Sequence, residues 1–423
     1  MTVLMNKKQE IKNRIDLINN GEVPEGYKKY HGFVHPIDWK HISFNQIFKE
    51  RCIKVSDTSK YPLYSLTIEN GVIPKTEQYE RSFLITKDED SYKVVKHNDF
   101  VYNPMNLRFG AIARYKDQED CSVSGYYNVF SIINSYNPYF MESFVKSQAM
   151  LNYYNTQATG SLIEKQRVHF SQFIEFNFAL PSEKEQEKIA EILSCCDKVI
   201  ELKEELIIKT TKKHNYILER IYKNFHTSTE YSLQEIADFR RGSFPQPYNL
   251  PEWYDADNGE PFVQVYDIDD NYQLKPTTKA RISNLAIPKS VFVPKGSLII
   301  SIQGSIGRVA ITQYDCYIDR TILIFTKFHK NIDKEFLLYA LKKLFDYEKE
   351  IAPGQTIKTI TKEVLSNFKI LLPSIEEQKT FSTIIRQFNK KIELLEQELE
   401  HYKQLKKALS QLLLTGIVRV NEV

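Results

Sequence analysis

Cysteine is scarce in this chain and is not arranged in pairs. The 423 residues include only Cys52, Cys121, Cys195, Cys196 and Cys316, and no C-x-x-C pair. Zinc sites usually need such pairs, and disulfide-rich secreted proteins need an even set of spaced cysteines. We therefore expect neither a metal site nor a disulfide framework, and a cytoplasmic location.

Long apolar runs and an excess of one charge are also missing. No stretch approaches the roughly eighteen apolar residues of a membrane span. The N-terminal segment is Lys-rich, with Leu4, Ile11, Ile15 and Ile18 on one helical face, so we do not expect a signal peptide or a membrane partner. A net charge of +3 permits nucleic-acid binding without indicating it. Any such surface must come from local clusters.

Enzyme motifs are incomplete. The segment Asn103-Pro104-Met105-Asn106 resembles the N-P-P-Y loop of amino-methyltransferases but lacks the aromatic residue that stacks on a flipped base. No G-x-x-x-x-G-K-[ST] motif is present, and Gly304-Ser305-Ile306-Gly307 is too short to hold a cofactor convincingly. We predict no catalytic, cofactor-binding or metal-binding residue in this chain.

What the chain does contain is an internal repeat. Leu-Pro-Ser-Glu-Lys-Glu-Gln at 180–186 returns as Leu-Pro-Ser-Ile-Glu-Glu-Gln at 372–378, an offset of 192 between Pro181 and Pro373. An apolar heptad pattern follows each copy. The sequence therefore predicts two half-molecules in series, each a globular segment followed by a helix of about forty residues.

Both helices share one narrow apolar seam. Its apolar members recur every seven residues, with a second row interleaved: Leu193, Ile200, Ile207 and Ile221 in the first copy, and Ile385, Ile392, Leu399 and Leu413 in the second. This spacing is typical of a coiled coil, so we expect the helices to pair antiparallel. Two unrelated surface helices would not share both a register and a cap.

Each helix also has the same predicted start. Ser182 with Glu185, and Ser374 with Glu377, have the spacing of a capping box, directly after a proline. Polar residues interrupt the seam at Lys203, Thr210, His214, Tyr402 and Lys406. Such residues usually specify register, so we interpret His214 in this way rather than as a metal ligand.

The globular segments have matching scaffolds and different surfaces. Both are predicted to contain a strand, a polar glycine-bearing loop and a second strand, at 96–115 and at 297–311. Their openings also match, Phe44-Asn45-Gln46-Ile47 against Leu233-Gln234-Glu235-Ile236. Most of the remaining sequence does not align, as expected if the halves recognise different things.

This pattern resembles the specificity subunit of Type I restriction-modification enzymes over nearly the whole chain. The resemblance includes Val23-Pro24-Glu25-Gly26-Tyr27 and Pro36-Ile37-Asp38-Trp39 near the N-terminus, and glycine-bearing segments before each helix, Thr159-Gly160-Ser161 and Pro353-Gly354-Gln355-Thr356. The family's helix-start motif commonly has a second proline where this chain has Ser182 and Ser374. That departure leaves the helix start intact.

The resemblance implies an α+β fold with two mixed α/β target-recognition domains, separated and joined by two long antiparallel coiled-coil helices in a pseudo-two-fold repeat. The expected boundaries are an N-terminal helical segment at 1–35, domain 1 at 36–180, spacer helix 1 at 181–225, domain 2 at 226–372 and spacer helix 2 at 373–423. Each domain would read one half of a split double-stranded DNA target, and the helices would set the gap.

The resemblance also implies the partners. Two modification subunits would methylate adenine with S-adenosylmethionine, restriction subunits would use ATP and Mg, and this chain would be a non-catalytic reader in host defence. Apolar residues outside the seam would contact the modification subunits, although they could instead face the globular domains or a second copy of this chain. A stand-alone DNA-binding or scaffold protein without enzyme partners stays open.

DNA contacts are predicted on the paired loops, because Arg reads guanine, Asn and Gln read adenine, and hydroxyls and Lys hold phosphates. The candidates are Asn106, Arg108, Gln157, Thr159 and Ser161 in the first half, and Arg240, Arg241, Ser243, Gln303, Ser305, Arg308, Gln355, Thr356 and Lys358 in the second. The acidic cluster Asp267, Asp269 and Asp270 should lie away from phosphates. Neither the target sequence nor the spacer length follows from these residues.

Overall fold

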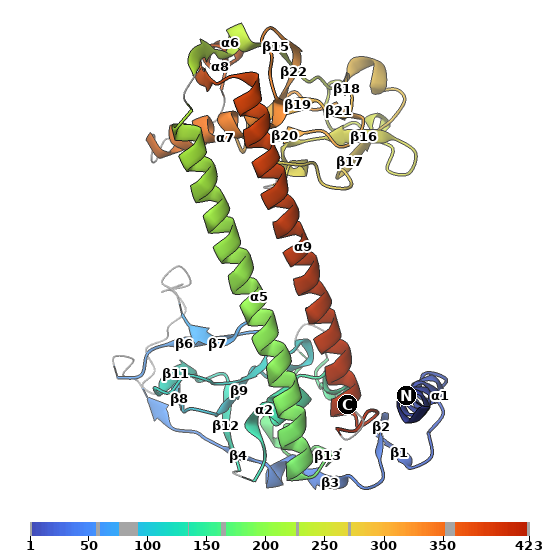
Figure 1. Ribbon diagram of the computed structural model, residues 1–423. Coiled ribbons are helices and arrows are strands. Elements are labelled where there is room, and N and C mark those ends of the chain that lie inside the picture. The colour runs from blue at the N-terminus through green and yellow to red at the C-terminus, as the bar shows by residue number, and fades with distance from the viewer. Residues whose placement is uncertain are drawn as a thin grey trace. The chain divides into compact units, whose positions relative to one another are not determined.

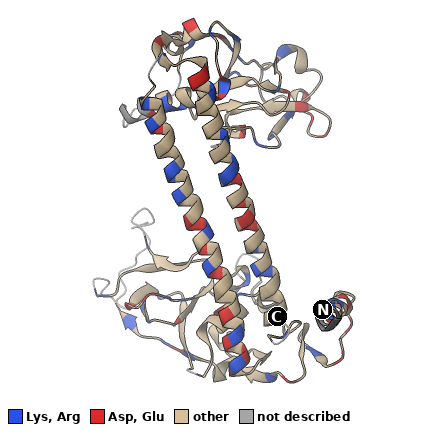
Figure 2. Ribbon diagram, in the orientation of Figure 1, with Lys and Arg blue, Asp and Glu red and all other residues tan. Residues whose placement is uncertain are grey.

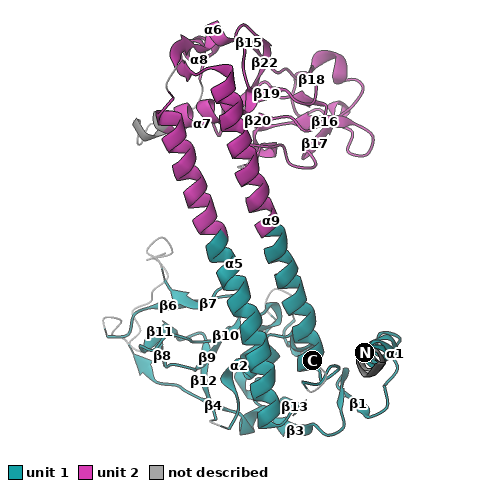
Figure 3. Ribbon diagram, viewed as in Figure 1, with its two compact units in different colours: residues 1–206, 396–423 teal, residues 207–395 magenta. Residues whose placement is uncertain are grey.

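The computed structural model describes residues 2–55, 60–75, 92–133, 135–161, 166–225, 228–269, 272–351 and 360–420. Two long helices dominate it, α5 (Glu183–Lys223) and α9 (Ile375–Leu414). The chain divides into two compact units, unit 1 at 1–206 with 396–423 and unit 2 at 207–395 (Figure 3). Each unit therefore contains a globular part and one portion of both long helices. The described helices include none that is long and apolar enough to cross a membrane.

Unit 1 is built around a four-stranded sheet with the order β10-β9-β12-β4 and a three-stranded sheet with the order β11-β8-β5 (Figure 1). Its helices are α1 (Thr2–Asn19), η1 (Phe44–Gln46), η4 (Leu107–Phe109), α2 (Pro138–Val145), α3 (Gln148–Gln157) and α4 (Phe170–Phe173). Its strands are β1 (Tyr27–Tyr30), β2 (Phe33–Pro36), β3 (Lys40–Ser43), β4 (Phe48–Glu50), β5 (Lys54–Val55), β6 (Tyr64–Thr67), β7 (Gly71–Pro74), β8 (Tyr92–Val95), β9 (Phe100–Tyr102), β10 (Ile112–Arg114), β11 (Cys121–Ser124), β12 (Asn128–Ile132) and β13 (Asn177–Leu180).

Unit 2 contains two four-stranded sheets, with the orders β15-β22-β19-β20 and β17-β16-β21-β18. Its helices are α6 (Leu233–Ile236), η6 (Pro251–Trp253), η7 (Val265–Asp267), η8 (Ile287–Lys289), α7 (Lys334–Ile351) and α8 (Lys362–Ser366). Its strands are β14 (Thr229–Ser232), β15 (Ala237–Arg241), β16 (Glu260–Val263), β17 (Ala280–Ile282), β18 (Val291–Val293), β19 (Leu298–Ser301), β20 (Val309–Ile311), β21 (Cys316–Ile318), β22 (Ile322–Phe328) and β23 (Lys369–Leu372).

The predicted duplication extends through the scaffold. In each unit one sheet consists of the strand that follows the opening, the two strands around the glycine-bearing loop, and the second strand after them (β12 or β22), in the same spatial order. The strand before each long helix pairs antiparallel with the strand before the opening, β13 with β3 and β23 with β14. The N–H of Phe44 donates to Phe176 O, and that of Leu233 to Phe368 O. The second sheet is different: its described strands β11, β8 and β5 pair antiparallel in unit 1, whereas β16 and β21 pair in parallel in unit 2.

The two long helices run antiparallel within each unit. In unit 1, Lys203 Nζ lies 2.5 Å from Glu398 Oε2, and Lys406 pairs with Asp197 further along both helices. In unit 2, the His214 ring stacks on the Phe388 ring with 4.8 Å between centroids. Moving forward along α5 therefore means moving backward along α9. The eight apolar seam residues are buried or half-buried, whereas most positions between them are exposed.

The two predicted capping boxes differ. The second is complete: Ser374 N donates to Glu377 Oε2 at 3.1 Å, and Glu377 N donates to Ser374 Oγ at 3.3 Å. In the first, Glu185 N still donates to Ser182 Oγ at 3.4 Å, but the Glu185 carboxylate binds the Arg419 guanidinium instead. The expectation of a reciprocal box at Ser182 is therefore wrong, because a charged partner competes successfully for the carboxylate.

The N-terminal segment closes unit 1 against the end of α9. Helix α1 ends at Asn19, and residues 27–36 form the β1–β2 hairpin, so the expected helical segment at 1–35 is helical only in its first part. Arg14 donates to Ile417 O at 2.5 Å, and Tyr27 Oη donates to Gly416 O at 2.8 Å. Arg419 also pairs with Asp38, which lowers the pKa of that carboxyl group. Segments from both ends of the sequence thus form one core.

Candidate nucleic-acid interface

The first-half loop is a compact turn at 103–110 between β9 and β10. Asn103 Oδ1 accepts the N–H of Met105 at 3.0 Å, and Gly110 has a φ of 97°, which favours glycine. Asn106 is exposed at the tip. The Arg108 guanidinium lies 4.6 Å from the centroid of the Phe109 ring, and that ring is 54% exposed. The loop therefore presents an amide and an arginine–aromatic pair, which are groups that DNA-binding surfaces use.

The candidates at 157–161 lie against this loop. Arg108 Nη1 donates to Gln166 Oε1 at 2.8 Å, and Val168 N donates to Pro104 O at 3.1 Å. Thr159 exchanges two backbone hydrogen bonds with Arg167. Thr159 and Ser161 are exposed and Gln157 is half-buried. The structure thus brings together the first-half candidates, which are about fifty residues apart in sequence, through the segment at 166–168.

The second-half loop at 301–308 has a different internal structure. Ser301 Oγ donates to Ser305 O at 2.6 Å and accepts the N–H of Arg308 at 2.9 Å. Ser305 is exposed and Gln303 is half-buried. Arg308 Nη1 donates to Ile268 O at 2.6 Å, so this guanidinium joins the loop to the end of η7. Ile360 N donates to Ile302 O, as Val168 N does to Pro104 O in unit 1.

Arg240, Arg241 and Ser243 lie at the end of β15. Both arginines are exposed, and Ser243 Oγ donates to Lys289 O at 2.8 Å. A Cβ atom on Gly242 would lie 2.3 Å from Ile318 O, so only glycine allows this close approach of the two backbones. Gln355, Thr356 and Lys358 lie outside the described residues, as does Asp270. Asp267 is buried and accepts the N–H groups of Gln264 and Lys279, which is a structural role.

The polar seam residues form specific contacts between the helices. Lys203 and Lys406 make ion pairs with Glu398 and Asp197, respectively, and Thr210 is buried. His214 is buried, its Nε2 has no hydrogen-bond partner, and burial lowers its pKa. Within the described residues, no three His, Cys, Asp or Glu side chains are placed to hold a metal ion. The ion pairs can form in only one alignment of the two helices, as expected of residues that set the register.

The apolar residues outside the seam divide into two groups by position along the helices. Near the ends, Leu218, Ile384 and Leu412 pack into the globular cores, which is the alternative that the sequence left open for apolar residues outside the seam. In the middle, Leu202, Leu206, Leu394 and Leu405 are 43% to 56% exposed. Both helices therefore carry apolar side chains that are exposed to solvent. Figure 2 shows charged residues of both signs along both helices.

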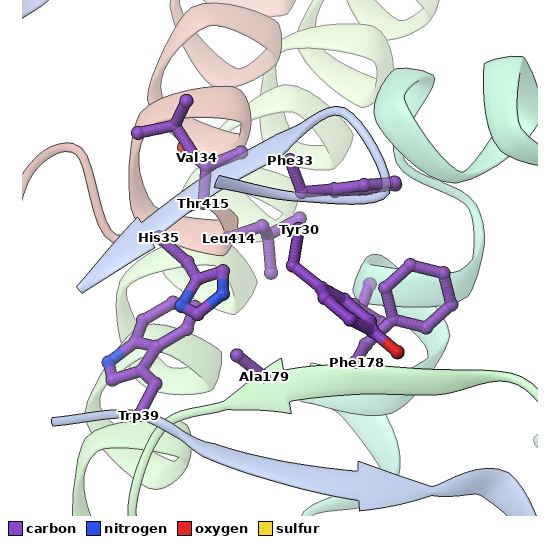
Figure 4. Close-up of a pocket in the computed structure, with 10 residues that line it drawn as sticks. Tyr30, Phe33, Val34, His35, Trp39, Phe178, Ala179, Leu414 and Thr415 are labelled. Carbon is purple, nitrogen blue, oxygen red and sulfur yellow. The ribbon is translucent and has the colours of Figure 1, made fainter. Parts of the chain in front are cut away.

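A small cavity lies where the β1–β2 hairpin meets β13 and the end of α9, with Tyr30, Trp39, Phe178 and Leu414 on its walls (Figure 4). His35 also lines it; this side chain is buried, its Nε2 has no partner, and burial lowers its pKa. The walls are almost entirely apolar. We interpret the cavity as a packing gap between the hairpin and the helix end.

One polar cluster in unit 2 was not among the sequence candidates. It joins Tyr248, Gln264, Tyr266 and Asp319 by hydrogen bonds, although Tyr248 and Asp319 are 71 positions apart. No spacing rule connects these residues, because the parallel pairing of β16 and β21 brings them together. The only sequence signal is the high aromatic content of this region.

Comparison with known proteins agrees with the duplicated scaffold. The model of the Type I restriction modification DNA specificity domain matches residues 36–212 and 227–404. Two proteins of Methanocaldococcus jannaschii, named as specificity subunits of the type I restriction enzymes MjaX and MjaVIII, are 23% and 22% identical to this chain; each alignment covers 94% of the chain and 97% of the relative.

A solved structure of the type I R-M system, described for complex assembly and conformational transition, contains a chain with a similar fold. The TM-score is 0.62 at 18% identity, covering 91% of this chain and 99% of that one. The two domain matches together cover most of the sequence, each reaching from a globular part into the long helix that follows it. With two such domains in one polypeptide, this protein belongs to the type I restriction-modification DNA specificity family, and its function is DNA recognition.

Proposed function

We propose that each half of this chain reads one half of a bipartite DNA target. The observation that carries the proposal is the contrast between the two kinds of sheet. The scaffold sheet has the same strand order in both units, whereas the other sheet and the loops differ. Base recognition depends on the side chains presented to the groove, so two different surfaces on one scaffold suit two different sequences.

The long helices would set the unread gap between the half-sites. A helix of 41 residues, the length of α5, spans roughly 60 Å at about 1.5 Å per residue. Its register with α9 is specified by the Lys203–Glu398 pair and by the His214–Phe388 stack. A fixed register gives a fixed length, and therefore a fixed number of base pairs at about 3.4 Å each.

Removing one heptad from each helix tests this role. Deleting 200–206 and 396–402 keeps the seam spacing in both helices and shortens each by roughly 10 Å. The preferred gap should shrink by about three base pairs. Deleting only one of the two segments is the matched control, because it misaligns the seam and should abolish activity rather than shift the gap. An unchanged gap in the double deletion would refute the ruler role.

Two modification subunits are the proposed protein partners, one for each half. The exposed leucines at the middle of the helices support docking there, since apolar side chains facing solvent on a paired helix favour further helices alongside. Restriction subunits would join the same complex. The alternative is that these leucines contact another copy of this chain.

We assign no catalytic step, cofactor or metal to this chain. The Asn103 side chain, which begins the segment that resembles a methyltransferase motif, accepts the N–H of Met105 and so stabilises its own loop. S-adenosylmethionine would be bound by the modification subunits, and ATP and Mg by the restriction subunits. Such a complex would act in the cytoplasm, where its DNA substrate lies.

The decisive experiment is to co-express the chain with its modification subunit and map methylated adenines across the host genome. A split motif with a constant gap supports bipartite reading. A continuous motif, or a stable complex without methylation, favours the alternative of a stand-alone DNA-binding or scaffold protein. The experiment distinguishes these two functions, because only a protein with two linked DNA-recognition domains yields two short sequences at a fixed distance.

A further inference from the structure

The polar cluster of unit 2 lies at the carboxyl ends of two parallel strands. Phe262 and Val263 of β16 pair with Tyr317 and Ile318 of β21, so the next residues, Gln264 and Asp319, emerge side by side. Asp319 N donates to Val263 O at 3.0 Å, and this hydrogen bond joins the ends of the two strands. In the corresponding sheet of unit 1 the described strands pair antiparallel, and the parallel bridge beside it joins single residues, Leu63 and Ser122. Among the described residues, two strands that pair in parallel and end at a shared edge are therefore found in the second half.

The hydrogen bonds of the cluster form a directed chain. Asp319 Oδ1 accepts the N–H and the hydroxyl of Thr321 at 2.8 and 2.6 Å, and its Oδ2 accepts Tyr248 Oη at 2.5 Å. Burial, together with the Asp319 carboxylate, raises the pKa of Tyr248, which keeps its proton on the hydroxyl. A carboxylate only accepts, so Tyr248 must donate to it. Asp319 thus fixes the direction of the first bond.

That direction determines the orientation of the Gln264 amide. Because the Tyr248 hydroxyl proton points to Asp319, its oxygen accepts from Gln264, and the amide atom facing it must be Nε2. Oε1 then faces the Tyr266 hydroxyl, which donates to it. Burial raises the pKa of Tyr266 to about 12, so this donor also keeps its proton. Each tyrosine occupies one bonding position, which leaves Gln264 one N–H and one lone pair.

The surroundings of the cluster suit a polyanion. Lys279 Nζ lies 5.1 Å from the Tyr266 ring centroid, and Arg320 Cζ lies 5.9 Å from the Tyr248 ring centroid. Both cations are exposed, and the Tyr266 ring is 39% exposed. Two carboxylates adjoin the cluster, and both are buried: Asp319, which accepts Tyr248, is 3% exposed, and Asp267, which accepts the N–H of Gln264, is 1% exposed. The surface therefore presents positive charge and an oriented amide together.

We propose that Gln264 is a specificity-determining residue that recognises the major-groove edge of an adenine in the second half-target, with Tyr248 and Asp319 as positioning residues. An oriented amide with one donor and one acceptor matches the N7 acceptor and the N6 donor of adenine. Lys279 and Arg320 contact the flanking phosphates. The inference rests on bipartite reading as proposed above, and it adds the base and the residue that reads it.

The test uses the full chain in complex with its modification subunit and compares the methylated motifs of wild type, Q264A and Y248F. Wild type should require an A·T pair, other than the methylated one, at one position of one half-target. Q264A should lower discrimination at that position by about tenfold or more, with the other half and the gap unchanged. Y248F keeps the ring but removes the hydroxyl, so it should lower discrimination at the same position by less than Q264A does. Gln234, an exposed glutamine of the same unit, provides the control Q234A, which should change nothing.

The possible results are distinguishable. A wild-type motif that is not split overturns bipartite reading, and this inference with it. A split motif that Q264A and Y248F leave unchanged overturns only the inference. A uniform loss of specificity at all positions also overturns it, because that pattern indicates a structural role. If Q264A does not assemble, Y248F decides the outcome at the same base pair.

Discussion

Gln378 accepts the backbone N–H of Asp333 through Oε1 at 2.9 Å while its Nε2 donates to Pro373 O at 2.9 Å. The side chain is 1% exposed. Gln186 makes the same two bonds in unit 1, to Asn137 N at 3.3 Å and to Pro181 O at 3.0 Å. The last residue of the repeated motif therefore ties the start of each long helix to the start of a domain helix, α2 or α7.

Replacing Gln378 should destabilise unit 2. Q378A leaves the Asp333 N–H and the Pro373 carbonyl without their partners, and such buried groups cost about 1–3 kcal/mol in the free energy of unfolding. Urea denaturation of the full chain measures the change. The control is Q387A, at an exposed position of the same helix, which should have little effect. Equal stability of the two variants would contradict the tie.

His214 should make the helix pair sensitive to acid. Burial lowers the pKa of this imidazole below its usual value of 6.5, so the unfolded chain binds the proton more tightly than the folded chain. The stabilising contribution is present above about pH 6.5 and is lost as the pH falls through the folded-state pKa. H214L should therefore lose less stability between pH 7 and pH 5 than wild type does.

The matched control for this pH dependence is H401L, because His401 is exposed on α9. Its unfolding midpoints in urea should follow those of wild type at both pH values. If H214L loses as much stability between pH 7 and pH 5 as wild type does, another group takes up the proton, and His214 does not cause the pH dependence.

Arg240 and Arg241 are expected to contact phosphates. Each phosphate contact adds about 0.9 to the slope of log affinity against log salt concentration. R240A and R241A should each weaken binding to a target duplex and reduce that slope by about one. Fluorescence anisotropy at several salt concentrations measures both quantities. K391A, on the exposed surface of α9, is the control. A loss of affinity with an unchanged slope would point to base contact or to misfolding instead.

Leu405 should lie in the interface with a modification subunit. Its side chain is 51% exposed on α9 within unit 1, which also contains the exposed Leu202 and Leu206. L405K should weaken co-purification of the modification subunit by tenfold or more, because a charge would be buried against apolar surface. Q404K places the same charge at the neighbouring exposed position and serves as the control. Sedimentation of the chain without the modification subunit tests the alternative of a second copy. If Leu405 contacts a second copy, L405K should have a lower sedimenting mass than wild type.

The sequence by itself determined the features that depend on local periodicity. A seven-residue apolar repeat on α5 and α9 can be buried only along one stripe, so the pairing of the helices follows from the spacing, and the polar residues within the seam select the register. The Leu-Pro-Ser motifs mark where each helix begins, since proline restricts the residue before it and serine caps the first turn. The strand-loop-strand pairs around 103–110 and 301–307 were found for the same reason, because strands and glycine turns have local signatures.

Only the tertiary structure decided features that depend on residues far apart in the chain. The Glu185 carboxylate binds Arg419 instead of capping its helix. Leu218, Ile384 and Leu412 pack into the cores of the units at the helix ends. The parallel pairing of β16 with β21 joins Gln264 to Tyr248 and Asp319. Local spacing specifies which face of an element is apolar, but the choice among distant polar partners follows from packing. In this protein the length and the pairing of the two long helices therefore follow from the sequence, whereas the polar cluster of unit 2 exists only in the folded chain.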